Sequence, residues 1–482
     1  MKSHTVALIL ALAAGHPLYA AVTPHALFSD GAVLQQGREI PVWGTANEGE
    51  SVRVEFAGQT VATTAKDGKW SVRLKPVKAG GPFKMTLSGE NTVVMNDLWV
   101  GEVWICGGQS NMERQLGPRP PQKPIDGWEE EVSKADYPRM RQFTVPQAIP
   151  PSGASPRIQG KWATCSPQTA AQFSAVGYFF GRDLHRKLNV PIGLIACNWG
   201  GTPAEAWTSR EALEAVPELR GLVENYDKAR NDYSTKLVTL AEGARPPKDP
   251  AGSQFSPTVL RDAMLTPIVP YGIRGVIWYQ GESNCWDSLR YRTLFPVTIT
   301  DWRKAWGQGD FPFLFVQLAP FKTNTPELRE AQLMTSRTVP NTAMVVTTDV
   351  GDAEDIHPTR KEPVGSRLAL AARAIVYGEK LEFSGPAFRS ATFSGGRATV
   401  RFDHLGGGLV AKDGSLKGFV IAGADKQFVP AQAEIQGDTV VVSNESVREP
   451  VAVRYGWATV PDVNLFNRAG LPASPFRTDD WR

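Results

Sequence analysis

The stretch Leu98-Trp-Val-Gly-Glu-Val-Trp-Ile-Cys-Gly-Gly-Gln-Ser-Asn-Met112 begins as an apolar run and ends in glycines and polar residues. Its first part, Leu98 to Ile105, is rich in residues that favour a buried strand. Gly107 and Gly108 allow a sharp turn and the close approach of a substrate. Ser110 therefore follows the carboxyl end of a predicted strand, where open α/β folds build their sites. The stretch predicts an α/β fold with a nucleophilic serine at one edge of its sheet.

The central part of the chain alternates between strand-like and helix-like segments. Four further apolar runs predict buried parallel strands: Ile192–Cys197, Gly275–Tyr279, Phe313–Gln317 and Ala343–Thr347. Apolar residues at helical spacing predict two helices, one through Val176, Phe180, Leu184 and Leu188 and one through Val364, Leu368, Ala372 and Ile375. This alternation predicts a parallel sheet with helices on both faces, over residues 98–385.

Both ends of the chain have a β-rich pattern. Short segments of alternating apolar and polar residues, separated by turn residues, fill residues 22–97 and again residues 386–482. Such strands at short regular spacing predict β-sandwich-like domains on either side of the α/β domain. Within the α/β domain, residues 208–256 are expected to form a loop or helical insertion.

The first 21 residues resemble a secretory signal. A lysine at position 2 precedes a short apolar run, Val6 to Ala14, and small residues end the segment at Ala20 and Ala21. The apolar run is too short to span a bilayer, and no later segment has about 18 uninterrupted apolar residues. We therefore expect a periplasmic or secreted protein without a membrane span.

Composition excludes some classes of partner and cofactor. The formal net charge of +3 over 482 residues gives no argument for nucleic-acid binding. The sequence has no Cys-x-x-Cys motif and no His-rich tract, so neither a metal site nor another cofactor is expected. Nothing in the sequence predicts an oligomeric state. The four cysteines, Cys106, Cys165, Cys197 and Cys285, are compatible with disulfides in an exported protein and equally with buried thiols.

A serine needs a base to become a good nucleophile, and His357 is the best candidate. It lies between the predicted strand Ala343–Thr347 and the following helix, at the same sheet edge as Ser110. Pro358 keeps His357 out of helical geometry. The other histidines lie in the predicted signal, in the β-rich ends or in a charged helical stretch: His4, His16, His25, His185 and His404.

A carboxylate is expected to orient the imidazole of His357. Asp355 precedes His357 by two residues and is favoured as the acceptor for the Nδ1 proton. Glu354 is the alternative, because several carboxylates crowd the same loop.

Acyl transfer also needs hydrogen-bond donors for the developing oxyanion. The expected donors are the backbone N–H of Ser110, the N–H of Gly200 or Gly201, with Gly201 preferred, and the side-chain amide of Gln280. Ordinary turns and loop caps would explain these residues individually. Polar residues near the same strand ends are expected to bind substrate: Gln109, Asn111, Glu282 and Asn284.

These motifs, taken in order, resemble those of the SGNH (GDSL-like) hydrolase superfamily and, within it, the sialate O-acetylesterase family. Met112 occupies the position where the α/β-hydrolase elbow requires glycine. The matching stretches are Gly101-Glu-Val-Trp-Ile-Cys-Gly-Gly-Gln-Ser-Asn-Met-Glu113, Asn198-Trp-Gly-Gly-Thr202, Trp278-Tyr-Gln-Gly-Glu-Ser-Asn284 and Asp355-Ile-His-Pro358. The sequence departs from the superfamily in one spacing, because its aspartate lies two residues before the histidine where three is usual.

The resemblance implies an SGNH-type three-layer fold and a metal-free serine esterase that removes O-acetyl groups from sugars through an acetyl-enzyme. Ser110, His357 and Asp355 would form its triad. The substrate would be an O-acetylated sialic acid or an acetylated plant polysaccharide. The alternatives are a non-catalytic carbohydrate-binding protein, to which 14 tryptophans would be suited, and a secreted lipase or peptidase.

Overall fold

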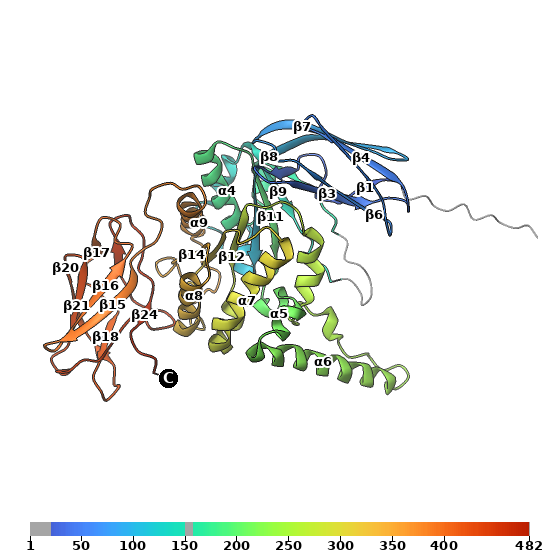
Figure 1. The fold of residues 1–482 in the computed structure, drawn as a ribbon. Coiled ribbons are helices and arrows are strands. Elements are labelled where there is room, and N and C mark those ends of the chain that lie inside the picture. Colours follow the sequence, from blue (N-terminus) through green and yellow to red (C-terminus); the bar gives the residue numbers. More distant parts are fainter. Residues whose placement is uncertain (1–20, 150–157, 482) are drawn as a thin grey trace, which may run out of the picture.

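The computed structural model describes residues 21–149 and 158–481 (Figure 1). The predicted signal segment, residues 1–21, lies outside these ranges apart from Ala21.

A row of parallel strands forms the centre of the molecule, in the order β9-β11-β8-β12-β13-β14. The strands are β8 (Thr92–Gly108), β9 (Tyr137–Thr144), β11 (Ile192–Asn198), β12 (Gly275–Tyr279), β13 (Phe313–Val316) and β14 (Thr342–Val345). A short strand, β10 (Ala163–Cys165), adds to β9 in antiparallel orientation. The strands predicted from apolar runs are confirmed, and their carboxyl ends meet at one edge.

The sheet as a whole is mixed, because antiparallel strands add to the parallel row predicted over residues 98–385. The first half of β8 pairs antiparallel with β7 (Gly80–Ser88), whereas its second half pairs in parallel with β11 and β12. Together with β2 (Val33–Gln35), β4 (Ser51–Phe56) and β5 (Gln59–Thr64) of the N-terminal part, these strands make an 11-stranded sheet of the described residues. One continuous strand therefore runs through the boundary expected between residues 97 and 98.

Helices cover both faces of the parallel strands. On one face, a Cβ placed at Gly177 of α4 (Ala175–Leu188) would lie 3.0 Å from Sγ of Cys106. On the other, a Cβ placed at Gly107 would lie 3.3 Å from the ring of Trp302 in α7 (Ser288–Trp306). Successive strand residues point to opposite faces, so α4 and α7 lie on opposite sides of β8.

Two more helices complete these layers. Helix α9 (Glu362–Ile375) packs on α4, and α8 (Pro326–Thr338) packs on α7. The helices α4 and α9 confirm the two predicted from apolar spacing.

The N-terminal strands share their core with the central sheet. Their alternating burial, clearest in β4 and β6, confirms the period of two in the sequence. Buried residues from Val22 to Ala372 form one continuous cluster. The remaining strands of this part are β1 (Thr23–Pro24), β3 (Ile40–Thr45), β4 (Ser51–Phe56), β5 (Gln59–Thr64) and β6 (Lys69–Leu74).

The C-terminal strands enclose a second, separate core between Ala398 and Phe476. They form two four-stranded sheets, β15-β16-β21-β20 and β19-β18-β22-β24, and the pair β17-β23. The bounds are β15 (Ala387–Ser394), β16 (Arg397–Asp403), β17 (Leu409–Ala411), β18 (Phe419–Ala422), β19 (Val429–Pro430), β20 (Gln432–Gln436), β21 (Thr439–Ser443), β22 (Ala452–Tyr455), β23 (Leu465–Asn467) and β24 (Phe476–Arg477).

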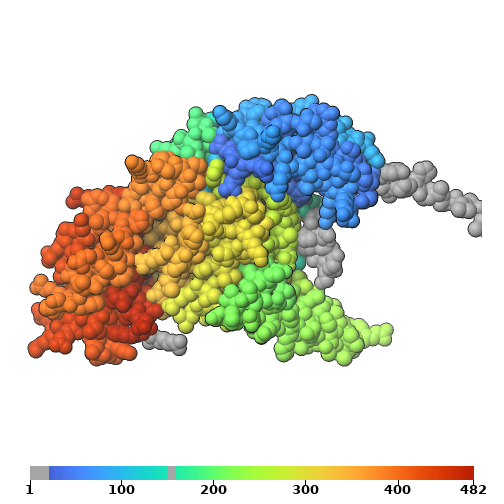
Figure 2. Space-filling model, in the orientation of Figure 1, coloured from blue at the N-terminus to red at the C-terminus, as the bar shows by residue number. Residues whose placement is uncertain are grey.

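Figure 2 shows this C-terminal part, in orange and red, against the central part in yellow. A buried arginine fixes the contact: Arg329 of α8 donates to the carbonyl oxygens of Ala458 at 2.7 Å and Thr459 at 2.8 Å.

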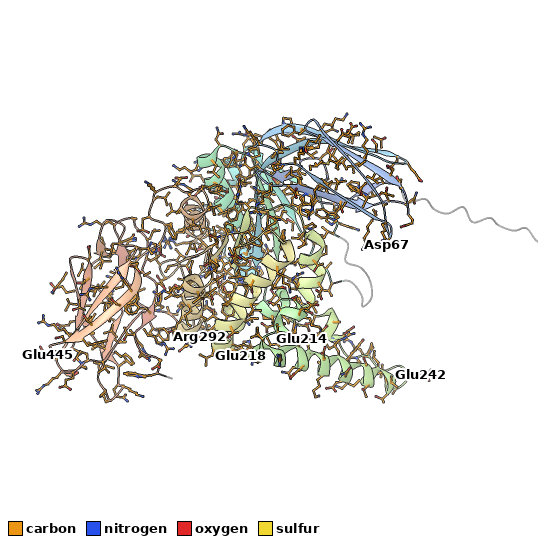
Figure 3. All side chains as sticks on the ribbon, in the orientation of Figure 1. Asp67, Glu214, Glu218, Glu242, Arg292 and Glu445 are labelled. Carbon is orange, nitrogen blue, oxygen red and sulfur yellow. The ribbon has the colours of Figure 1, made fainter. Side chains whose placement is uncertain are left out.

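The expected insertion contains a long helix. Helix α6 (Pro217–Val238) extends away from the body of the molecule, with Glu242 beyond its far end (Figures 1 and 3). Leu219 and Val223 are its buried residues, so little of the helix packs on the core. The other short helices are α1 (Ser110–Glu113), α2 (Trp128–Ser133), α3 (Pro167–Ala170) and α5 (Arg210–Glu214).

All four cysteines are free, and Cys106, Cys165 and Cys197 are buried. Of the two states that the sequence allowed, disulfides or thiols, the structure has thiols. In the two described ranges, no helix is long and apolar enough to cross a membrane.

Candidate active site

A pocket of about 520 Å³ opens at the carboxyl ends of β8, β11 and β12. It brings together all four sequence motifs, because Ser110, Gly201, Glu282 and His357 all line it. The other lining residues are Gln109, Glu113, Arg119, Gln122, Gln147, Trp199, Gly200, Glu282, Ser283 and Ile356.

Ser110 owes its position to a close approach of two strand ends. Gly108 has a φ of +131°, and a Cβ there would lie 2.2 Å from the carbonyl oxygen of Tyr279 at the end of β12. The next residue, Gln109, donates its N–H to that same oxygen at 2.9 Å. Ser110 then begins the short helix α1 and lines the pocket.

His357 reaches the pocket from the loop between β14 and α9. Burial lowers the pKa of its imidazole, and the charge of nearby Lys361 lowers that pKa further. The carboxylate of Asp355 acts in the opposite direction, but more weakly. His357 is therefore favoured in its neutral form, the form that can accept a proton.

Asp355 is the carboxylate beside His357. Its Oδ1 accepts the backbone N–H of His357 at 2.8 Å and lies 3.9 Å from the ring Nδ1, beyond hydrogen-bond distance. The side chain of Glu354 is 79% exposed and pairs with Lys322 at 3.4 Å. Of the two carboxylates expected from the sequence, only Asp355 lies next to the imidazole.

Two backbone N–H groups at the pocket are placed to act as donors. Ser110 is the first residue of α1, where N–H groups have no partner within the helix. Gly201 has a φ of +76° and donates to no acceptor in the part of the chain that the structure describes. The N–H of Gly200, the alternative, donates to Oε2 of Glu113 at 2.5 Å. This contact leaves Gly201 as the free donor of the pair.

The side chain of Gln280 does not reach the pocket, which corrects its expected part as an oxyanion donor. Gln280 is 0% exposed. Its Nε2 donates to the carbonyl oxygen of Thr202 at 3.2 Å and to Oδ1 of Asn284 at 2.7 Å, so both of its hydrogens have acceptors. Its Oε1 accepts from the hydroxyl of Tyr291 at 2.9 Å. The residue ties β12 to neighbouring segments.

The four residues expected to bind substrate divide into two groups. Gln109 and Glu282 line the pocket. Asn111 and Asn284 are buried and lie outside the lining. Asn284 donates to Glu205 at 2.9 Å and accepts from the N–H of Ala204 at 3.0 Å. Its amide therefore joins the segment after β12 to the segment after β11.

Asn111 joins two parts of the site that are far apart in the sequence. Its Nδ2 donates to Oε1 of Glu282 at 2.6 Å and to the carbonyl oxygen of Ile356 at 2.9 Å. Asn111 follows Ser110, and Ile356 precedes His357. The amide therefore connects the serine helix directly to the histidine loop.

Lys361, which no sequence motif singled out, completes this connection. Its ammonium donates to Oδ1 of Asn111 and lies 5.4 Å from the centre of the Tyr279 ring. Burial lowers the pKa of Lys361 to about 7, and burial raises the pKa of Glu282. The only signal was its place in the same loop, four residues after His357, and lysines there are usually solvated.

No group of three or more His, Cys, Asp or Glu side chains among residues 21–149 and 158–481 is arranged to hold a metal ion.

Comparisons with known proteins agree on one family. Residues 100–374 match the carbohydrate esterase family described as sialic acid-specific acetylesterase. The sialate O-acetylesterase of Rattus norvegicus is 34% identical over 396 residues, 72% of each chain, and that of Mus musculus is 30% identical over 505 residues, 90% of each chain. The crystal structure of a carbohydrate acetylesterase from Xanthomonas citri aligns with a TM-score of 0.83 and 38% identity, over 96% of this chain and 100% of that one.

The contacts of Asn111 predict what its removal does. Asn111→Ala would leave buried Lys361 and half-buried Glu282 without their shared partner, at a cost of about 2 kcal/mol in the free energy of unfolding. It would also loosen the histidine loop, so kcat on an acetyl ester should fall by roughly 10- to 100-fold. Urea unfolding and steady-state kinetics measure the two effects. Asn231→Ala in the exposed part of α6 is the control. If both variants changed the free energy of unfolding and kcat equally, Asn111 would not have this connecting role.

Proposed function

Because the chain belongs to the sialate O-acetylesterase family of carbohydrate esterases, and is thus a carboxylic ester hydrolase, we propose that it removes O-acetyl groups from carbohydrates with Ser110 as nucleophile. One observation carries the proposal: Ser110 and His357, 247 positions apart (357 − 110), line the same pocket at the carboxyl ends of the parallel strands.

In the proposed reaction, the Ser110 hydroxyl attacks the acetyl carbonyl while His357 accepts its proton. His357 then gives the proton to the departing sugar oxygen, which leaves an acetyl-enzyme. Water, activated by the same imidazole, hydrolyses this intermediate and restores the serine. Asp355 stabilises the imidazolium that forms in each half of the reaction.

The N–H groups of Ser110 and Gly201 are the proposed donors for the oxyanion. Both belong to residues of the pocket wall, and their backbone positions are set by the ends of β8 and β11. Backbone donors fixed in this way need no rearrangement as charge develops on the carbonyl oxygen.

The substrate class follows from the relatives and from the pocket. The mammalian relatives are named for sialates and the Xanthomonas citri relative for carbohydrates in general. An acetylated sialic acid and an acetylated plant polysaccharide such as hemicellulose are therefore both proposed as substrates. Charged and polar side chains in the pocket, including Glu113, Arg119 and Gln122, suit sugar hydroxyl groups better than a long acyl chain.

We further propose that residues 98–385 form an SGNH-type three-layer domain. The β-sandwich-like region 22–97 shares strand β8 and the main core with it, and the β-sandwich-like domain 386–482 has its own core. Residues 1–21 are proposed as a signal peptide that directs the protein to the periplasm or out of the cell. Fractionation of expressing cells and mass measurement of the mature N-terminus would test this localisation.

Ser110→Ala tests the function itself. Wild type should release acetate from O-acetylated sugars and cleave acetyl esters faster than butyryl esters, with octanoyl esters barely hydrolysed. The variant should lose roughly 10⁴-fold in kcat while its unfolding midpoint stays unchanged, because the nucleophile is removed and little packing is lost. Acetate release and kcat/KM over a series of acyl lengths are the measurements. A maximum at eight carbons or more would support a lipase instead.

Asp355 and Glu354 provide a matched pair of isosteric variants. Asp355→Asn should lower kcat by about 100-fold or more, because the imidazolium loses its neighbouring charge. Glu354→Gln should stay within about twofold of wild type, since its carboxylate is exposed and pairs with Lys322. A larger loss from Glu354→Gln would assign the third member of the triad to Glu354.

The pH dependence follows from the lowered pKa of His357. The base must be neutral, so activity should rise with pH as His357 loses its proton. Burial and the Lys361 charge favour the neutral form, so the midpoint of this rise in kcat/KM should lie below the ordinary histidine value of about 6.5. A rate profile from pH 4 to 8 measures the midpoint; one above 7, or a flat profile, would be inconsistent with this environment.

A further inference from the structure

Trp286 is an exposed tryptophan with a fixed orientation. It is 72% exposed, although tryptophan is among the more buried residue types. It lies in the 3-10 helix Glu282–Asp287, and its indole N–H donates to the carbonyl oxygen of Ser283 at 2.9 Å. Since the protein already satisfies the only polar group of the ring, the apolar faces are what Trp286 presents to solvent.

This ring is attached to the wall of the pocket. Ser283, which holds the indole, lines the pocket, and its hydroxyl donates to the carbonyl oxygen of Gly201 at 2.8 Å. Gly201 carries one of the proposed oxyanion donors. Trp286 itself is not part of the lining, so it lies outside the pocket beside the wall formed by Ser283 and Gly201.

A second exposed ring lies beside the same wall. Phe255 is 53% exposed, and its ring lies 3.3 Å from the position that a Cβ would take at Gly201. Phe255 comes from the inserted segment before β12, whereas Trp286 follows β12. Two segments of the chain thus each bring one exposed aromatic ring to the outside of this wall.

We infer that Trp286 and Phe255 form a subsite for a neutral pyranose ring of a glycan whose acetylated residue occupies the pocket. This inference rests on the proposed function. One face of a pyranose consists largely of C–H groups, and covering it with an aromatic ring removes apolar surface from water. A ring whose orientation is already fixed loses little freedom when it binds.

The charges near Trp286 favour a neutral sugar. The adjacent carboxylate, Asp287, forms an ion pair with Arg290 at 2.7 Å. In the pocket lining, Arg119 forms an ion pair with Glu113 at 2.8 Å. Arg290 and Arg119 are thus each paired with a carboxylate of the protein, and neither is an unpaired cation that could bind an acidic sugar. The subsite therefore selects extended, neutral oligosaccharides over a free acidic monosaccharide.

The experiment compares a substrate that is long enough to contact Trp286 with one that is not. O-acetylated xylotetraose would extend to Trp286, whereas methyl acetate fills only the acetyl site. Trp286→Ala should lower kcat/KM on acetylated xylotetraose tenfold or more, through KM, and leave kcat/KM on methyl acetate within twofold of wild type. Phe255→Ala should act in the same direction. Leu289→Ala, which removes an exposed side chain three residues away, is the matched control and should change neither value.

The outcomes separate the inference from the proposed function. An unchanged KM for acetylated xylotetraose in Trp286→Ala, or an equal loss on both substrates, overturns the subsite. Wild type that cleaves O-acetylated monosaccharides but not acetylated xylotetraose overturns the subsite and leaves the proposed function standing. Wild type that cleaves methyl acetate but no acetylated sugar overturns the proposed function, and the subsite with it.

Discussion

The side-chain amide of Asn111 is the interaction on which the arrangement of the site depends. It binds Glu282 after β12, the backbone of Ile356 in the histidine loop and the ammonium of Lys361 at once. Each contact starts from the residue directly after Ser110. Few side chains other than asparagine or glutamine could serve here, because both donors and the acceptor of one amide are used. The distance between the proposed nucleophile and base is therefore set by a group that does not line the pocket.

Burying the polar groups that Asn111 connects costs free energy, and this cost restricts the histidine loop to few positions. Burial disfavours the charged forms of both Lys361 and Glu282, and Oε2 of Glu282 has no hydrogen-bond partner among the described residues. The Tyr279 ring faces the lysine and the amide bridges the two groups, which offsets part of that cost. Because a buried polar group without its partner is unfavourable, few alternative positions of the histidine loop satisfy these atoms.

Strand β8 imposes the second constraint. Its first half belongs to the N-terminal β structure and its second half to the parallel sheet, so the two regions cannot shift in register independently. The strand ends at Gly108, where the backbone passes so close to Tyr279 that a side chain would collide with it. The position of Ser110 thus depends on pairing that begins more than ten residues earlier, at Thr92.

The sequence by itself determined the parallel strands except β9, the helices α4 and α9, and the positions of Ser110 and His357 near the ends of elements. These features are local: apolar runs and helical spacing record which residues are buried, and strand ends follow from them. The tertiary structure decided what each polar side chain faces. It turned Gln280, Asn111 and Asn284 inward, separated Asp355 from Glu354, and buried Lys361, none of which has a signature in neighbouring residues. The same holds for the second half of β8, whose partners β11 and β12 lie far away in the sequence. Hydrogen bonds between distant segments leave no periodic pattern, so only the assembled fold could reveal them.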